Sequence, residues 1–295
     1  MQKSDVISPK ESASLNKTTV FEGVPRIVSL VPSITELLFD MGLGAYVVGR
    51  TGFCVHPAPA VFAVPKVGGT KDVNIAKIRR LAPTHVLVNV DENQLATVQA
   101  LRACVPHVIV THPITPFDNL ALVDQIYDAF KATKLIAIYD HLTMTSAIKN
   151  EIKQKLEQLK ATREAKEQKV LYLIWKDPWM TVARDTYISQ MLDLIGWKTW
   201  PPVNGGDGIA TAGAARYPVV LGNEDWLASV DKVLLSSEPY SFKTCHIHEV
   251  RQWLPHAQVQ LVDGEMLSWY GSRAVLGLEY LVQLAKSDSS ANGLA

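Results

Sequence analysis

Short apolar runs alternate with amphipathic segments between residues 25 and 132. The runs are apolar at successive positions, as strands buried on both faces of a parallel sheet require, whereas the segments between them show the spacing of helices. The predicted strands are residues 27–31, 46–48, 85–90 and 108–111. The predicted helices are residues 33–41, 74–81, 94–104 and 117–130. This alternation predicts an α/β lobe with a parallel sheet.

The same alternation returns after residue 169. The predicted strands are residues 170–175, 232–236 and 258–262. The predicted helices are residues 186–195, 224–228, 247–254 and 272–285. We therefore predict a second α/β lobe of similar plan.

A long segment without Gly or Pro, residues 133–167, separates the two series. Its apolar residues Ile148, Ile152, Leu156 and Leu159 fall on one stripe of a helix. One continuous helix of this length would extend about 50 Å, because each residue adds roughly 1.5 Å, and it would then bridge two lobes. The alternative is a pair of helices broken near His141.

The predicted fold class is therefore α/β, with two Rossmann-like lobes whose parallel sheets are joined by a long bridging α-helix. The expected boundaries are a disordered N-terminal arm (1–24), an N-terminal α/β lobe (25–132), the bridging helix (133–168), a C-terminal α/β lobe (169–286) and a polar tail (287–295).

Charge and composition limit the partners. The 29 basic residues balance the 29 acidic residues, so no long-range field attracts nucleic acid or an anionic membrane. The first 23 residues lack a secretory apolar run, and no later segment has the roughly 18 apolar residues of a membrane span. We expect no nucleic-acid partner, no membrane span, and a cytoplasmic location as the sequence is written, or a periplasmic one if an export signal is missing. The three cysteines, Cys54, Cys104 and Cys245, show no CxxC spacing and are expected to be reduced thiols.

The strongest local signal is the strand-to-helix turn at residues 26–42. Ser33 precedes Glu36 by three residues, the spacing of a capping box, and Gly42 can end the helix in a left-handed conformation. The helix N-terminus would point into the crevice at the carboxyl end of the strand, where open α/β sheets bind ligands. This predicts a binding site at Pro32 and Ser33.

Three motifs on this framework resemble those of a known family. They are Arg26-Ile-Val-Ser-Leu-Val-Pro-Ser-Ile-Thr-Glu36, Val73-Asn-Ile-Ala-Lys-Ile-Arg-Arg-Leu-Ala-Pro-Thr-His-Val-Leu-Val88 and Trp269-Tyr-Gly-Ser-Arg273. Together with the two-lobed plan, the chain from about residue 25 to residue 284 resembles the helical-backbone metal receptors, periplasmic binding proteins that capture cobalamin, ferric siderophores or haem for ABC importers. The cobalamin-binding branch is nearest. The resemblance implies a substrate-binding protein that captures a metal chelate or corrinoid such as cobalamin between two lobes, without a covalent cofactor.

The chain departs from the family in three ways. It shows no export signal. The surface glutamates with which family members dock onto an ABC permease correspond to Ala76 and Glu224 here, so docking to such a permease is expected to be weakened. The tryptophan that precedes the second motif in the cobalamin branch corresponds to Thr70, so a wall of the ligand site is altered.

Candidate ligand residues in the first lobe follow predicted strands. They are Pro32, Ser33, Phe53, Cys54, His56, Thr70, Lys71 and Glu92. Cys54 and His56 suit a soft or borderline metal, but a structural role is the more common one, and no metal is assigned. The backbone of Gly68 to Lys71 could hold an anion, without the spacing of a P-loop. Beside Glu92, Asp91 or Asn93 could instead cap the following helix.

Candidates in the second lobe are mostly aromatic, and all seven tryptophans follow residue 174. They are Trp175, Trp179, Tyr217, Tyr240, Glu265, Trp269, Tyr270 and Arg273. Flat rings suit a macrocycle because they bury a large area with few rotors. Trp175 fits a core role as well as a ligand role, Trp179 is the better ligand candidate, and Arg273 could simply pair with a carboxylate. The resemblance supplies Tyr217 and Glu265.

Two other functions remain open at this point. The first is a cytosolic enzyme that uses Cys54 or His56 with Glu92, although no known catalytic motif supports it. The second is a cytosolic interaction protein on the same scaffold. The segment from Cys245 to Glu249 contains His-X-His, but it is predicted to begin a helix rather than to bind zinc.

Overall fold

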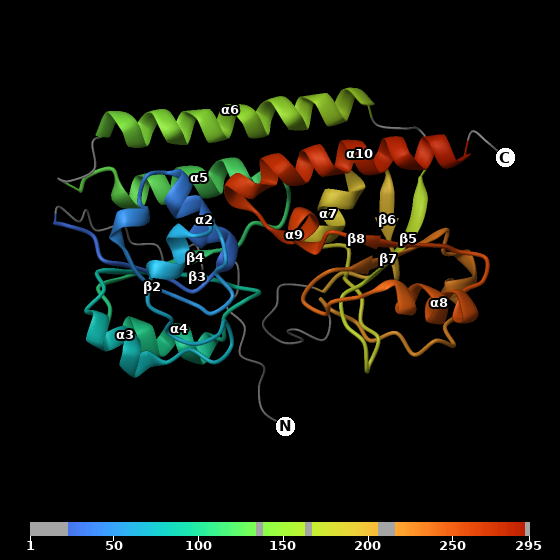
Figure 1. The fold of residues 1–295 in the computed structure, drawn as a ribbon, viewed down its shortest axis with the longest axis horizontal. Coiled ribbons are helices and arrows are strands. Elements are labelled where there is room, and N and C mark those ends of the chain that lie inside the picture. The colour runs from blue at the N-terminus through green and yellow to red at the C-terminus, as the bar shows by residue number, and fades with distance from the viewer. Residues whose placement is uncertain (1–22, 134–137, 163–166, 206–215, 293–295) are drawn as a thin grey trace. The chain divides into compact units, whose positions relative to one another are not determined.

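The computed structural model describes residues 23–133, 138–162, 167–205 and 216–292 (Figure 1). The predicted N-terminal arm therefore lies, up to residue 22, outside the described residues. The chain divides into two compact units. Unit 1 comprises Met1–Pro113, Phe117–Ile152 and Tyr270–Arg273, and unit 2 comprises Ile114–Pro116, Lys153–Trp269 and Ala274–Ala295.

Unit 1 contains a four-stranded parallel sheet in the order β2-β1-β3-β4. The strands are β1 (Ile27–Ser29), β2 (Val47–Arg50), β3 (His85–Asn89) and β4 (His107–Thr111). The helices are α2 (Pro32–Asp40), α3 (Ile75–Leu81), α4 (Leu95–Arg102) and α5 (Asp118–Phe130). Figure 1 shows α3 and α4 on one face of the sheet and α2 and α5 on the other. Because both faces are covered, the strands are apolar at successive positions, as predicted.

Alternation along each strand builds a separate core on each face. Val86 and Val88 of β3 pack with Ile78 of α3 and Val98 of α4. Leu87, between them, is also fully buried and points to the opposite face, since successive side chains of a strand alternate. The sheet thus holds its strand ends in fixed positions, from which the loops at its carboxyl edge extend.

Unit 2 repeats this plan with the order β6-β5-β7-β8, again entirely parallel. The strands are β5 (Gln168–Leu173), β6 (Trp197–Thr199), β7 (Lys232–Ser236) and β8 (Gln258–Val262). The helices are α7 (Tyr187–Asp193), α8 (Thr244–Trp253), α9 (Gly264–Ser268) and α10 (Ala274–Asn292). The predicted class of two α/β lobes with parallel sheets is confirmed. The last helix extends to Asn292, into the segment predicted to be a polar tail.

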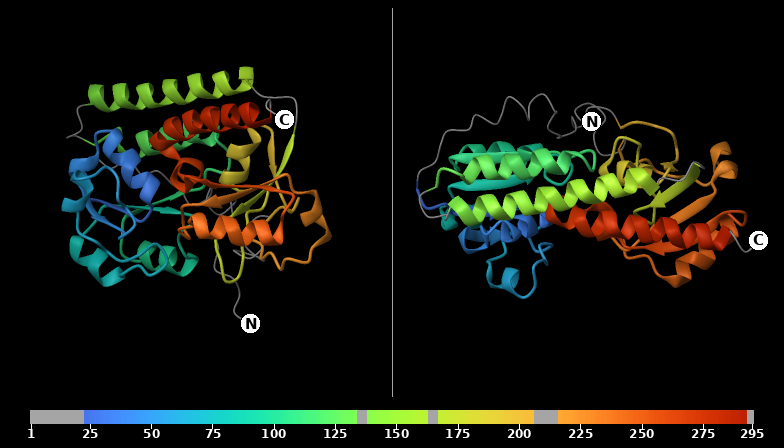
Figure 2. Two further views of the ribbon diagram at one scale, coloured as in Figure 1. Left: turned by 45° about the vertical axis from the view of Figure 1, so that its right-hand side comes forward. Right: turned by 90° about the horizontal axis from the view of Figure 1, so that it is seen from above.

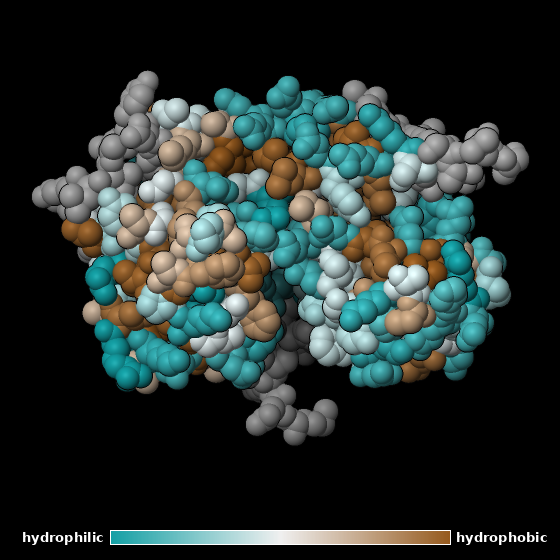
Figure 3. Space-filling model, in the orientation of Figure 1, coloured by the Kyte–Doolittle hydropathy of each residue, from teal (hydrophilic) through white to brown (hydrophobic). Residues whose placement is uncertain are grey.

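The predicted long helix is α6 (Ile138–Thr162), and it is continuous through His141, so the alternative of a break there is wrong. The division between the two units falls within it, after Ile152. Its apolar stripe is buried at Ile152, Leu156 and Leu159, while Figure 3 shows hydrophilic residues along much of its outer surface. In unit 2, α6 and α10 run side by side (Figure 2), and Lys155 Nζ lies 2.5 Å from Glu279 Oε1.

Candidate functional site

Each sheet has a topological switch point at which the chain turns to opposite sides. In unit 1 the connections that leave β1 and β3 diverge, and in unit 2 those that leave β5 and β7 diverge. Open parallel sheets bind ligands in the crevice outside the carboxyl ends of such strands. The residues to consider therefore follow Ser29, Asn89, Leu173 and Ser236, the last residues of these four strands.

The turn after β1 differs from the predicted capping box. The helix begins at Pro32, so the N-cap is Val31, which has no side-chain cap, and Ser33 lies inside the first turn. Proline is well suited to a first helical position because it lacks the N–H group that would be unsatisfied there. Glu36 instead pairs with Arg273. The capping box is therefore wrong, whereas the left-handed Gly42 after the helix is confirmed, with φ of 77°.

Pro32 and Ser33 are both buried. The Ser33 side chain interacts with the Tyr270 hydroxyl, and this interaction lowers the pKa of Tyr270. The first turn of α2 is thus covered by Tyr270, which belongs to unit 1.

Two predicted residues far apart in the sequence, Glu92 and Tyr270, meet in unit 1. The Tyr270 hydroxyl donates a hydrogen bond to Glu92 Oε1 at 2.7 Å. Burial raises the pKa of Tyr270 well above its ordinary value, and the neighbouring Glu92 carboxylate raises it further. Tyr270 therefore stays protonated and acts as a donor, and Glu92 acts as an acceptor at the carboxyl edge of β3.

Charged groups surround this pair. Lys71 Nζ donates to the backbone oxygen of Asp91 at 2.9 Å, and Asp91 Oδ2 lies 3.4 Å from His112 Nε2. Desolvation lowers the pKa of Lys71, while Glu92 and Asp91 act in the opposite direction. His112 was not among the residues predicted from the sequence, although it directly follows β4, and its position at a strand end was the available signal.

Neither Asp91 nor Asn93 caps the next helix, because the N-cap of α4 is Gln94. Asn93 is buried, and its side chain accepts from the amide of Asn89 at 2.9 Å and donates to the oxygen of Thr70 at 3.0 Å. It therefore ties the loop that contains Thr70 to the end of β3.

The three candidates after β2 lie in different environments. Phe53 is 62% exposed, Cys54 is fully buried, and His56 is half-buried. Burial raises the pKa of the Cys54 thiol, against the effect of hydrogen bonds with Thr35 and Thr51. A buried, protonated thiol is a poor nucleophile and a poor metal ligand. This geometry disfavours the enzyme that would use Cys54.

Thiol reactivity provides a direct check of these environments. Cys245 is exposed at the start of α8 and Cys54 is buried. We expect native Cys54 to react with a thiol reagent about a hundredfold more slowly than Cys245, because its reaction requires local opening. Cys245→Ser should remove the fast phase and Cys54→Ala should leave it unchanged. Loss of the fast phase in Cys54→Ala would contradict this assignment.

In unit 2, the loop after β5 presents aromatic rings. Trp175 is 41% exposed, and its ring meets that of Tyr240 edge-on at a centroid distance of 5.7 Å. Trp179 is half-buried and stacks on Phe242 and on Trp253, with centroids 5.9 Å away in each case. The more accessible ring is therefore Trp175, the reverse of the preference drawn from the sequence.

The loop after β7 places an acid at the switch point of unit 2. Glu238 Oε1 accepts hydrogen bonds from Trp269 Nε1 and Ser268 Oγ, both at 2.8 Å. Burial raises the pKa of Glu238, whereas these two hydrogen bonds lower it. Glu238 follows the predicted strand 232–236 in the same short segment as the candidate Tyr240, but only Tyr240 was placed among the predicted ligand residues.

The remaining candidates vary in accessibility. Tyr217 and Glu265 are half-buried, the latter in the first turn of α9. Arg273 is 8% exposed and forms a two-point ion pair with Glu36, at 2.7 and 2.6 Å. Its guanidinium is thus engaged in unit 1, which is the alternative role considered for it from the sequence.

The two positions that the resemblance aligns with permease-docking glutamates, Ala76 and Glu224, lie in different environments. Ala76 is exposed on α3. Glu224 is half-buried, and its carboxylate accepts from the amides of Leu221 and Gly222, each at 2.8 Å. The Glu224 carboxylate is therefore held in place by its own loop.

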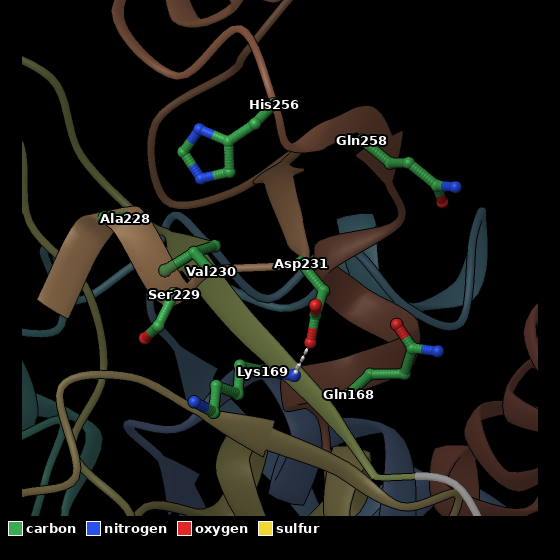
Figure 4. Close-up of a pocket in the computed structure, with 8 residues that line it drawn as sticks. All are labelled: Gln168, Lys169, Ala228, Ser229, Val230, Asp231, His256 and Gln258. Atoms are coloured by element: carbon green, nitrogen blue, oxygen red, sulfur yellow. Dashed lines mark hydrogen bonds between the residues drawn. The ribbon is translucent and has the colours of Figure 1, made fainter.

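A hollow of about 460 Å³ lies at the opposite, amino edge of the sheet in unit 2 (Figure 4). Gln168 and Gln258, the first residues of β5 and β8, contribute to it, and Asp231 accepts from the amide of Lys169 at 2.7 Å. Its lining consists of Gln168, Lys169, Ala228, Ser229, Val230, Asp231, His256 and Gln258. None of the predicted ligand residues lines it.

Two kinds of feature are absent from the part of the chain that the structure describes. No group of three or more His, Cys, Asp or Glu side chains there is arranged to hold a metal ion. Within the same residues, every helix is too short or too polar to cross a bilayer.

Comparisons with known proteins give consistent results. Residues 27–213 match the sequence profile of the periplasmic binding protein family. An uncharacterized ABC transporter substrate-binding lipoprotein of Bacillus subtilis (strain 168), YvrC, is 26% identical over 284 residues, which cover 95% of this chain and 85% of the relative. The periplasmic vitamin B12 binding protein BtuF of Vibrio cholerae has a TM-score of 0.69 at 19% identity, covering 90% of this chain and 99% of that one. The periplasmic haem-binding protein RhuT of Roseiflexus sp. RS-1 has a TM-score of 0.67 at 19% identity, covering 89% and 100%. At such identities the solved structures show a shared fold.

Proposed function

We propose that the ligand of this protein is a metal chelate of the corrinoid type. The chain belongs to the periplasmic binding protein family. The predicted resemblance to this family is confirmed, and with it the reading as a substrate-binding protein. The identity of the ligand is our proposal. It is supported by the side chains that the two sheets present at their carboxyl edges.

The observation that carries this proposal is the exposed ring of Trp175. It lies at the carboxyl end of β5, 41% exposed, with Tyr240 against it. A flat indole supported by a second ring offers a large rigid surface to a planar macrocycle and loses little entropy on binding. Phe53, 62% exposed after β2, is a comparable surface in unit 1.

The charges in unit 1 favour one class of macrocycle over another. Asp91 and Glu92 place two carboxylates at the carboxyl edge of β3, accompanied by Lys71. Carboxylates accept hydrogen bonds and repel other carboxylates. The amide groups on the rim of a corrinoid can donate to them, whereas the two carboxylates of haem would be repelled. This supports a cobalamin-like ligand over haem.

A titration tests the ligand. Purified protein is mixed with cyanocobalamin, dicyanocobinamide, haem and a ferric siderophore, and its melting temperature is followed. A ligand that binds the native state at a hundredfold excess over Kd raises the unfolding free energy by about 2.7 kcal/mol. We expect this stabilisation with the two corrinoids. A panel in which no compound shifts the melting temperature would contradict the proposal.

Truncation of the exposed ring should weaken corrinoid binding. Removing a hot-spot aromatic costs about 2 kcal/mol or more, so Trp175→Ala should raise the Kd for cyanocobalamin roughly 30-fold. The matched control is Trp226→Phe, since Trp226 is half-buried in the 3-10 turn that precedes β7, at the amino edge of the sheet. Equal affinity of Trp175→Ala and wild type, measured by absorbance titration, would remove Trp175 from the site.

The partner we propose is an ABC permease. The family relationship supports it, and the B. subtilis relative is named for the same kind of transporter. Glu224 offers a carboxylate held in place by backbone amides, while Ala76 offers none. Docking to the permease would therefore depend mainly on the carboxylate of Glu224.

A further inference from the structure

The loop after β2 presents apolar side chains to solvent with little regular structure of its own. Phe53 is 62% exposed and Phe62 57% exposed, and the loop contains only the 3-10 turn Ala60–Ala63. A loop with so little regular structure loses conformational entropy when it is ordered. Holding an exposed ring in one place therefore requires interactions elsewhere in the loop.

Arg50 supplies such interactions from the end of β2. Its side chain is 2% exposed. Nε donates to the oxygen of Val61 at 2.8 Å, and Nη1 donates to the oxygens of Thr51 at 3.1 Å and Cys54 at 3.0 Å. One guanidinium thus joins the beginning of the loop to the 3-10 turn within it. Because the guanidinium is planar and its N–H donors point in fixed directions, these hydrogen bonds hold the backbone oxygens in defined positions.

The bonds of Nη1 fall on both sides of Phe53. Thr51 and Cys54 flank the pair formed by Gly52 and Phe53, so the backbone that carries the ring is held before and after it. Cys54 adds a second anchor, since its Sγ lies 3.0 Å from Thr35 Oγ1 in α2 and 3.1 Å from Thr51 Oγ1. These anchors are buried.

The ring itself lies against a later stretch of the same connection between β2 and α3. A Cβ added to Gly69 would come within 3.4 Å of Phe53 Cε2. This stretch also carries Lys71, which donates to the backbone oxygen of Asp91 after β3. Phe53 therefore belongs to the set of side chains at this edge of the sheet.

We propose that Arg50 is a positioning residue for ligand binding, which acts by holding Phe53 in its binding conformation. The proposal rests on the proposed function, because it takes Phe53 as a ligand contact. If the ring is already ordered in the free protein, less conformational entropy is lost on binding, and the affinity for the ligand is higher. Cys54 shares this supporting role and does not contact the ligand.

A double-mutant cycle tests whether Arg50 acts through Phe53. Arg50→Lys keeps the positive charge but lacks the planar guanidinium that donates to several backbone oxygens at once. Cyanocobalamin should therefore bind this variant about tenfold more weakly. Phe53→Ala should also weaken binding. In the Phe53→Ala background, Arg50→Lys should have little further effect, because the ring that it positions is absent. An unchanged Kd in Arg50→Lys, or a full tenfold loss that persists without the ring, would overturn the proposal.

Hydrogen exchange provides a readout that needs no ligand. The amides of Val61 and Phe62 are hydrogen bonded within the loop. In Arg50→Lys they should exchange at least about tenfold faster, while the amides of β3 remain unchanged, since local opening is separate from global unfolding. Unchanged protection in the loop would overturn the proposal. If cyanocobalamin fails to bind the wild type while the loop amides respond as expected, the ligand class is wrong and the role of Arg50 in ordering the loop is supported.

Discussion

Arg273→Ala should lower the free energy of unfolding of unit 1 by about 3–5 kcal/mol, the usual cost of leaving one partner of a buried ion pair alone. Arg273 donates to both oxygens of Glu36, at 2.7 and 2.6 Å. The two residues are 8% and 9% exposed. The variant would leave the Glu36 carboxylate buried without its guanidinium, and water could not fully replace it.

Removing both charges should cost much less. A double variant, Glu36→Gln with Arg273→Met, avoids the unpaired charge and should recover a large part of the lost stability. The matched control is Arg79→Ala, because Arg79 is exposed on α3 of the same unit and a surface change of this kind is usually worth less than about 0.5 kcal/mol.

The probe must report on unit 1. All seven tryptophans belong to unit 2, so tryptophan fluorescence follows the other unit. Urea unfolding should therefore be followed by hydrogen exchange of α2 amides together with circular dichroism. A change below about 1 kcal/mol in Arg273→Ala would show that the pair does not stabilise unit 1 in the way its burial indicates.

The second large effect is a loss of stability in acid that depends on His85. Its ring is 2% exposed, stacks on His107 with a centroid distance of 4.6 Å, and contacts Phe130. The Thr84 hydroxyl lies 2.8 Å from Nδ1. Burial, with a smaller effect of His107, lowers the pKa of His85 to about 3. Burial also lowers the pKa of His107.

The sign follows from proton uptake. An unfolded histidine has a pKa of about 6.5, so between about pH 6.5 and pH 3 the unfolded chain binds a proton that folded His85 does not. Stability is therefore complete above the unfolded pKa and falls as the pH is lowered, by about 1.4 kcal/mol per pH unit for this one group.

A difference measurement isolates the effect of His85 from that of the carboxylates. Between about pH 6.5 and pH 4, the wild type should lose about 3 kcal/mol more stability than His85→Phe, whose ring can still pack on Phe130. His248→Gln, at an exposed position of α8, is the control and should keep the wild-type slope. Parallel pH profiles for the wild type and His85→Phe would show that His85 is not the group responsible.

The strands were largely predictable from the sequence. β7 has the predicted range, and β3 ends one residue earlier than expected. Strands covered on both faces are apolar at successive positions. Such a run of adjacent apolar residues can be recognised in the sequence without knowledge of distant segments. β6 and α9 were not predicted because three and five residues are too few to display a period. The capping box failed for a different reason, since the residue that engages Glu36 is Arg273, far away in the sequence.

The sequence by itself determined the two α/β lobes, the long helix and the strand ends at which ligand residues lie, because adjacent residues set the hydrophobic period. Only the tertiary structure decided which side chains at those ends remain accessible. Phe53 and Trp175 are exposed, whereas Cys54 is buried and Arg273 is paired. Burial and pairing depend on neighbours contributed by distant segments, as Tyr270 is for Glu92, and no local pattern identifies those neighbours.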